Sequence, residues 1–192
     1  MPGFGDPHAR VLILGLAPGA HGANRTGRVF TGDRSGDFLY RALYQAGFAS
    51  QPESISKQDG LALTDAYITA AVRCAPPDNR PTPEEFHRCQ PWLEREIELL
   101  PNVQVVLLLG RLAFDTYLRI LQKQGVIRRR SEFAFAHGRI IRIGAAQPML
   151  LCSYHPSQQN TSTGRLTAAM LLDVMQSARN ALIATAVVPP VR

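Results

Sequence analysis

The sequence predicts an α/β fold in three layers, in which a four-stranded parallel central sheet is flanked by helices. Continuous apolar runs, typical of strands buried on both faces, occupy residues 10–16, 66–72, 103–109 and 149–153. Helical patterns follow the strands at residues 35–46, 82–100, 112–121 and 167–184. This alternation favours a parallel sheet, because crossover connections place helices on both faces.

Local signals support individual elements. Thr82 is a helix N-cap residue, and Pro83 with two following glutamates suits a first helical turn. Gly47 marks the end of the first helix. Residues 139–143 alternate between polar and apolar types, which predicts a short edge strand. Four prolines within residues 74–83 predict a stiff loop.

Length and hydropathy indicate one domain. The chain has 192 residues, of which 45% are hydrophobic, so a single domain over residues 1–192 has ample apolar material for its core. We expect a frayed tail at residues 187–192, which contain two prolines. No apolar run reaches the roughly 18–20 residues that span a bilayer, and residues 1–10 lack a secretory signal. We therefore expect a cytoplasmic protein without a membrane partner. We also expect a monomer.

The charge balance points to a polyanionic partner. The net charge is +6, and Lys57 and Lys123 are the only lysines among 21 basic residues. Arginine suits phosphates, so nucleic acid is one reading; replacement of lysine by arginine through genome composition is the other. The chain has three cysteines, an odd number that argues against a disulfide framework.

Three unusual loops follow the first, second and last core strands. Ligands of parallel α/β sheets bind beyond the carboxyl ends of strands, so these loops predict a site. The first loop reads GLAPGAHGANRTGRVFTGD over residues 15–33. It is not a phosphate-binding loop, because Arg28 and Val29 stand where lysine and serine or threonine are required. This weakens the alternative of a nucleotide-dependent enzyme with a flavodoxin-like fold.

Two side chains in these loops are candidates for chemistry. Phe30 lies among polar and glycine residues, where it can stack on a flat ligand or cap the core. His155 follows the last strand and precedes Pro156, so it is rigidly aimed. It can donate a hydrogen bond to a leaving group, although a structural role is the alternative.

The three loops together resemble the uracil-DNA glycosylase superfamily, and in detail its family 5, the B-type enzymes. The resemblance rests on the first loop, on TAAVRCAPPDNRPTPEE at residues 69–85 and on SYHPSQQNTSTGRLT at residues 153–167. It implies the fold of that superfamily. It also implies a repair enzyme that flips a damaged base out of DNA and hydrolyses its N-glycosidic bond.

The resemblance also implies roles for site residues. Phe30 would stack on the flipped base, and His155 would donate to uracil O2 as charge develops there. Asp33 would hold the water or offset the cationic sugar, and Asn79 is a second polar candidate for water or base contact. The remaining base-binding positions are Gly15, Leu16, Ala17 and Ala70.

Ala70 stands where the related thermostable family has a base-reading asparagine. Loss of that amide removes strict selection for uracil, since such specificity comes from paired polar groups. We therefore expect a broad substrate range that includes hypoxanthine, xanthine or etheno-cytosine.

The partner implied is double- or single-stranded DNA that contains damaged bases. The residues expected to contact it are Arg25, Arg28, Arg73, Arg80, Gln158, Gln159, Asn160 and Arg165. Residues 158–160 are a candidate wedge for the gap that the flipped base leaves. A non-catalytic DNA- or nucleotide-binding module on the same fold remains the alternative function.

The resemblance finally implies a [4Fe–4S] cluster held by four cysteines. Cys74 and Cys89 match the second ligand pair, whereas the first pair should precede Met1. Two thiolates do not hold such a cluster. Either the cluster has been lost or an N-terminal cysteine-bearing segment is missing, and truncation is the expectation favoured here.

Overall fold

The computed structural model describes residues 1–186, and its centre is a six-stranded sheet of order β1-β3-β2-β4-β6-β5. The four central strands are parallel, as the sequence predicts. They are β2 (Val11–Gly15), β3 (Ala66–Ala70), β4 (Val105–Leu109) and β6 (Met149–Ser153). Two-residue strands, β1 (Phe4–Gly5) and β5 (Ile140–Ile141), add antiparallel edges. The sequence predicted the second of these edges and missed the first.

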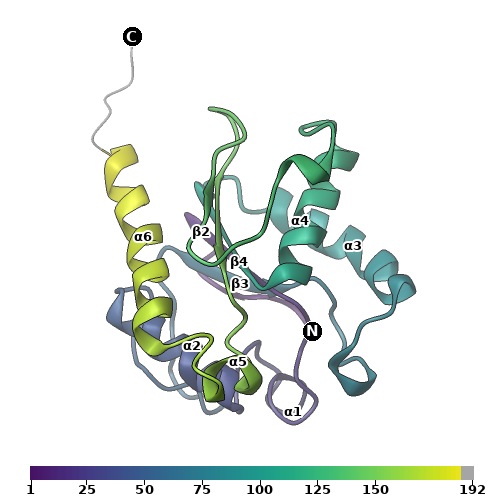
Figure 1. The fold of residues 1–192 in the computed structure, drawn as a ribbon. Coiled ribbons are helices and arrows are strands. Elements are labelled where there is room, and N and C mark those ends of the chain that lie inside the picture. The colour runs from purple at the N-terminus through teal and green to yellow at the C-terminus, as the bar shows by residue number, and fades with distance from the viewer. Residues whose placement is uncertain (187–192) are drawn as a thin grey trace.

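Helices cover both faces of the sheet (Figure 1). One face packs against α2 (Arg34–Gln45) and α6 (Ala168–Ala186) through side chains such as Ile13 and Leu107. The other packs against α3 (Pro83–Glu98) and α4 (Arg111–Lys123). The central strands are buried on both faces, which explains why their sequences are continuous apolar runs. The three-layer α/β architecture is therefore confirmed.

Short elements occupy the loops beyond the carboxyl ends of the strands. The loop after β2 contains α1 (Ala23–Thr26), and the loop after β3 contains the 3₁₀ turn η1 (Pro77–Asn79). The loop after β6 contains α5 (Gln158–Ser162), and α1 and α5 lie at the same end of the molecule in Figure 1. A further 3₁₀ turn, η2 (Arg130–Glu132), follows α4.

Among residues 1–186, the structure has no helix with the length and apolar character needed to cross a membrane. The predicted fraying concerns residues 187–192, which lie outside the described residues.

Helix α3 begins where its sequence predicts. The Thr82 side chain accepts a hydrogen bond from the Glu85 amide at 3.2 Å, and the Glu85 carboxylate accepts one from the Thr82 amide at 2.7 Å. This reciprocal pair satisfies two backbone donors at the helix start. Pro91 lies inside the helix without ending it.

Thr82→Ala tests this cap. It should lower the free energy of unfolding by about 1 kcal/mol, as measured by urea denaturation. Gln176→Ala is a control on the exposed surface of α6, away from any helix start. An equal loss in both variants would contradict the capping account.

Candidate active site

Asp33 joins the first loop to α2. Its side chain accepts a hydrogen bond from the Gly36 amide at 3.0 Å and so caps the helix. Its other carboxylate oxygen, Oδ2, lies against the backbone of Gly19 and Gly22. A Cβ on Gly22 would overlap this carboxylate, and one on Gly19 would come within 2.9 Å of Oδ2. Glycine at these two positions is therefore what allows the carboxylate to lie inside the loop.

Phe30 covers the end of β2. Its ring packs so closely on Gly15 that an added Cβ there would lie 2.8 Å from a ring carbon. The ring centroid is 5.8 Å from that of His155, with a 35° angle between the ring planes. The backbone of Phe30 has φ 51°, a left-handed conformation that is uncommon for a non-glycine residue. Phe30 therefore lies in the site beside His155 and does not simply extend the core.

His155 is half-buried where β6 ends. Burial lowers the pKa of its imidazole to about 4, although the negative charge of Asp33 acts in the opposite direction. The ring is therefore neutral near pH 7 and carries one N–H donor. The backbone carbonyl of His155 accepts a hydrogen bond from Asn160 Nδ2 at 2.8 Å, which ties it to α5.

His137, which the sequence analysis missed, supports the strand end before His155. Its Nδ1 accepts a hydrogen bond from the Tyr154 amide at 3.2 Å, and its ring stacks on Tyr154 with a 5.0 Å centroid separation. The guanidinium of Arg165 lies over the same Tyr154 ring, 4.7 Å from its centroid. Burial lowers the pKa of His137, which favours the neutral form that can accept this bond. A single histidine outside the loop motifs carries no sequence signal for this role.

The first two loops meet through backbone pairing. Gly15 is the register partner of Ala70, and the ladder continues when the Ala71 amide donates to the Gly15 carbonyl at 3.0 Å. The Val72 amide donates to the Leu16 carbonyl at 2.9 Å. Leu16, whose carbonyl takes part in this pairing, and the following Ala17 are half-buried. The structure thus brings most of the predicted base-binding positions to one end of the sheet.

Asn79 is placed differently. It lies on the exposed turn η1, where Asp78 and Asn79 have φ of 51° and 54°. Within residues 1–186 no hydrogen bond joins its side chain to Asp33 or His155. Its predicted part in water or base contact therefore stays a prediction.

Two of the residues predicted to contact DNA have partners inside the protein. Arg28 is only 3% exposed, and its guanidinium is paired with Asp59 at 2.6 Å inside the protein. Arg73 forms an ion pair with Glu96 at 2.8 Å and donates to the Met1 and Trp92 carbonyls. Both guanidinium groups are taken up by internal partners, so neither presents a free charge to phosphate.

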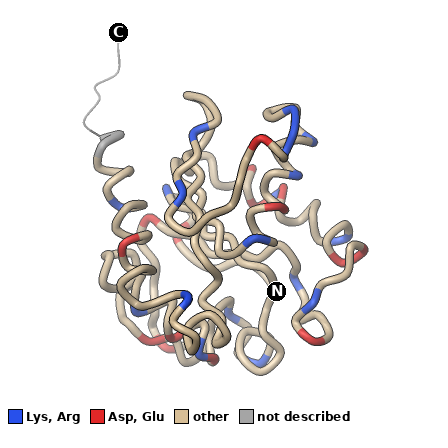
Figure 2. Tube along the Cα trace, viewed as in Figure 1, with Lys and Arg blue, Asp and Glu red and all other residues tan. Residues whose placement is uncertain are grey.

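The other predicted DNA contacts remain accessible. Exposed side chains are Arg25, Arg80, Gln158, Gln159 and Arg165, and Asn160 is half-buried through its bond to His155. Basic residues are spread over several elements (Figure 2). Three consecutive arginines at residues 128–130 lead into η2, and the sequence predicts no role for them.

The cysteines do not form a cluster site. Cys74 is exposed, Cys89 is half-buried with its Sγ accepting the Arg73 amide at 3.4 Å, and Cys152 is buried in β6. Burial raises the pKa of the Cys152 thiol to about 11, which disfavours the thiolate that binds metal. Within residues 1–186, no three histidine, cysteine or acidic side chains are grouped so that they could hold a metal ion. These residues do not fit a [4Fe–4S] cluster, which takes four thiolates.

Comparison with known proteins agrees with the loop motifs. The family model for the uracil DNA glycosylase superfamily matches residues 2–179. The chain belongs to the uracil-DNA glycosylase superfamily. Type-5 uracil-DNA glycosylases of Thermus thermophilus and Pyrobaculum aerophilum are 53% and 45% identical over 93% of the chain, and the chain spans 78% and 74% of their lengths. A type-5 enzyme of Mycobacterium bovis is 49% identical over 93% of the chain, which spans 65% of it. The predicted resemblance to family 5 is confirmed.

The state of His155 is directly measurable. The pKa of His155 is about 4 in the folded protein, whereas an unfolded histidine has a pKa of about 6.5. Between these pH values the unfolded chain therefore binds more protons than the folded chain. Stability from this group is therefore complete above about pH 6.5 and is lost as the pH falls through about 4. The ring ¹⁵N chemical shifts of His155, assigned by comparison with His155→Gln, should report a neutral imidazole from about pH 8 to about pH 5.5. A His155 midpoint of about 6.5 would contradict the burial argument.

Proposed function

We propose that the protein is a DNA glycosylase that removes uracil and related damaged bases and leaves an abasic site. One observation carries the proposal: Phe30, neutral His155 and the Asp33 carboxylate converge beyond the carboxyl ends of β2 and β6. The relatives at 45–53% identity are named uracil-DNA glycosylases, which supports the same activity.

The reaction requires an extrahelical base. A base inside the duplex is stacked and paired, so its glycosidic bond cannot reach a protein site unless the nucleotide is extruded. Phe30 offers an aromatic face for the extruded base, and Gly15 allows that ring to approach the β2 backbone closely. Backbone at Leu16 and Ala17, with Ala70 on the neighbouring strand, would line the edge of the base.

His155 would stabilise the departing base. As the C1′–N bond breaks, its electron pair moves onto the base and the charge gathers on uracil O2. A neutral imidazole N–H donates a hydrogen bond to this oxygen without transferring its proton, and partial burial strengthens that bond. Burial thus prepares His155 in the protonation state that the role requires.

Asp33 would act on the sugar. The sugar becomes oxocarbenium-like, and a carboxylate can offset its charge or orient water toward C1′. The water oxygen forms the new bond to C1′, and the released proton balances the charge of the departed base. Because the first loop has Gly19 and Ala20 after its proline, the carboxylate role falls to Asp33, with Asn79 as a second polar candidate.

DNA would be held by the exposed residues of the same loops. Arg25, Arg80 and Arg165 are available to phosphates. The exposed Gln158 and Gln159, with Asn160, would enter the space left by the flipped base in double-stranded DNA. Single-stranded DNA would need no such wedge, and one protomer would suffice for either substrate.

Single-turnover excision from a uracil-containing duplex, with alkali to cleave abasic sites, tests the proposed activity. We expect His155→Ala and Asp33→Asn each to slow excision by about 100-fold or more, the scale of losing one preorganised electrostatic group. Gly22→Ala, which displaces the Asp33 carboxylate, should also slow it. Gly144→Ala is the matched control, because an added Cβ there meets nothing within 4 Å. DNA retention without alkali-labile sites would instead favour the non-catalytic binding module.

A panel of damaged bases tests the specificity. Because Ala70 has no side-chain amide with which to select uracil, we expect excision of hypoxanthine, xanthine or etheno-cytosine as well as uracil from matched duplexes. His155→Ala should lower the rate on each base, which assigns the activities to one site. A profile restricted to uracil would contradict the expectation of a broad range.

A further inference from the structure

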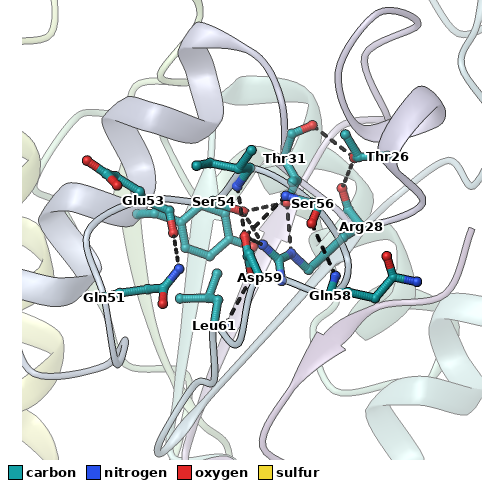
Figure 3. A network of polar contacts seen from close by, with 12 residues as sticks. Thr26, Arg28, Thr31, Gln51, Glu53, Ser54, Ser56, Gln58, Asp59 and Leu61 are labelled. Carbon is teal, nitrogen blue, oxygen red and sulfur yellow. Dashed lines mark hydrogen bonds and ion pairs between the residues drawn. The ribbon is translucent and has the colours of Figure 1, made fainter.

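Phe30 is flanked by residues that are anchored to a loop outside the candidate active site. This anchoring loop comprises residues 54–61, between α2 and β3, and supplies no side chain to the site. Figure 3 shows Arg28 and Thr31, from the first loop, pointing toward Ser54 and Asp59 of the anchoring loop.

Arg28 makes the central contact. Its Nη1 and Nη2 donate to the two oxygens of Asp59 at 2.9 and 2.6 Å, which is a bidentate pair. Nη2 also donates to Ser54 Oγ at 2.7 Å, and Nε donates to Thr31 Oγ1 at 3.0 Å. The guanidinium lies 4.9 Å from the centroid of the Phe4 ring. Every nitrogen of this buried cation therefore has a partner.

The Asp59 carboxylate also has several hydrogen-bond partners within the protein. Besides Arg28, its carboxylate accepts the backbone amides of Ile55, Ser56 and Leu61 at 2.8 to 3.2 Å. Hydrogen bonds from Arg28 and these amides hold the pKa of Asp59 well below its usual range. The carboxylate thus organises its own loop and neutralises Arg28 at once.

Both sides of Phe30 are tied down by this arrangement. On the carboxyl side, Thr31 is fully buried and its Oγ1 lies 2.6 Å from Ser54 Oγ. On the amino side, the Tyr40 hydroxyl donates to the Val29 carbonyl at 3.0 Å. A left-handed backbone at a phenylalanine persists only where its surroundings impose it, and these contacts impose it at Phe30.

We propose that Asp59 is a positioning residue that acts through Arg28 and Thr31 to hold the Phe30 ring in place for the flipped base. The inference rests on the proposed stacking role of Phe30. Removing the Asp59 charge would leave the buried guanidinium of Arg28 without its counterion. Residues 28–31 would then rearrange, and the Phe30 ring would leave its place over Gly15.

A double-mutant cycle in single-turnover excision tests the proposal, with Asp59→Asn, Phe30→Leu and the double variant. Loss of base stacking should make Phe30→Leu about 10-fold slower. Asp59→Asn should be slower by a similar factor, whereas adding it to Phe30→Leu should slow excision less than about 2-fold, because coupled residues are not additive. Thermal denaturation should show the same loss of stability from Asp59→Asn in both backgrounds.

Two further variants keep the test sound. Asp65→Asn is the matched control, because the Asp65 carboxylate also accepts two hydrogen bonds from one arginine, Arg10. Asp65 directly precedes β3, whereas the candidate active site lies beyond the carboxyl end of that strand. It should lower the melting temperature without slowing excision in samples assayed while fully folded. Ser54→Ala removes one hydrogen bond of Arg28 and one of Thr31 but leaves the ion pair, so it replaces Asp59→Asn in the cycle if that variant does not fold.

The outcomes separate the two claims. If Phe30→Leu alone leaves excision unchanged, the stacking role in the proposed function fails. If Phe30→Leu slows excision but Asp59→Asn does not, or if Asp59→Asn costs the same factor in both backgrounds, the positioning role of Asp59 is overturned while the proposed function stands.

Discussion

The left-handed backbone of Phe30 is the constraint on which the rest of the candidate site depends. It lays the aromatic ring against Gly15 and beside His155, and an extended backbone at this position would direct the ring elsewhere. Such a conformation costs on the order of 1–3 kcal/mol. The buried contacts of Arg28, Thr31 and Tyr40 offset that cost. Buried polar contacts beside the site therefore hold the apolar ring of Phe30 in place within it.

Burial acts on the chemistry of the site as well as on its shape. It keeps His155 neutral, and it does so against the opposing effect of Asp33. A charged imidazole would be attracted to Asp33, whereas a neutral ring remains free to donate to a ligand. The glycines of the first loop keep the Asp33 carboxylate nearby without a side chain in its way. The glycines of this motif are therefore needed because they leave room for the Asp33 carboxylate.

Much of this arrangement could be predicted from the sequence because its signals are local. Each core strand is a continuous apolar run, and the cap of α3 lies within residues 82–85. The loops that meet at the site follow from the parallel order of β2, β3 and β6. The fates of the arginines could not be predicted, because Arg28 and Arg73 find partners 31 and 23 positions away, at Asp59 and Glu96. An arginine in a polar loop looks the same in sequence whether it faces solvent or an internal carboxylate. His137 was missed for the same reason, since its bond to Tyr154 joins separate segments.

The central claim is that Phe30, His155 and Asp33 surround a base removed from the DNA stack. A crystal structure of Asp33→Asn bound to a uracil-containing duplex tests it most directly. The account predicts an extrahelical uracil stacked on Phe30, a hydrogen bond from the His155 ring to uracil O2, and Arg28 still paired with Asp59. A uracil that remains stacked in the duplex, or one bound away from Phe30 and His155, would contradict it.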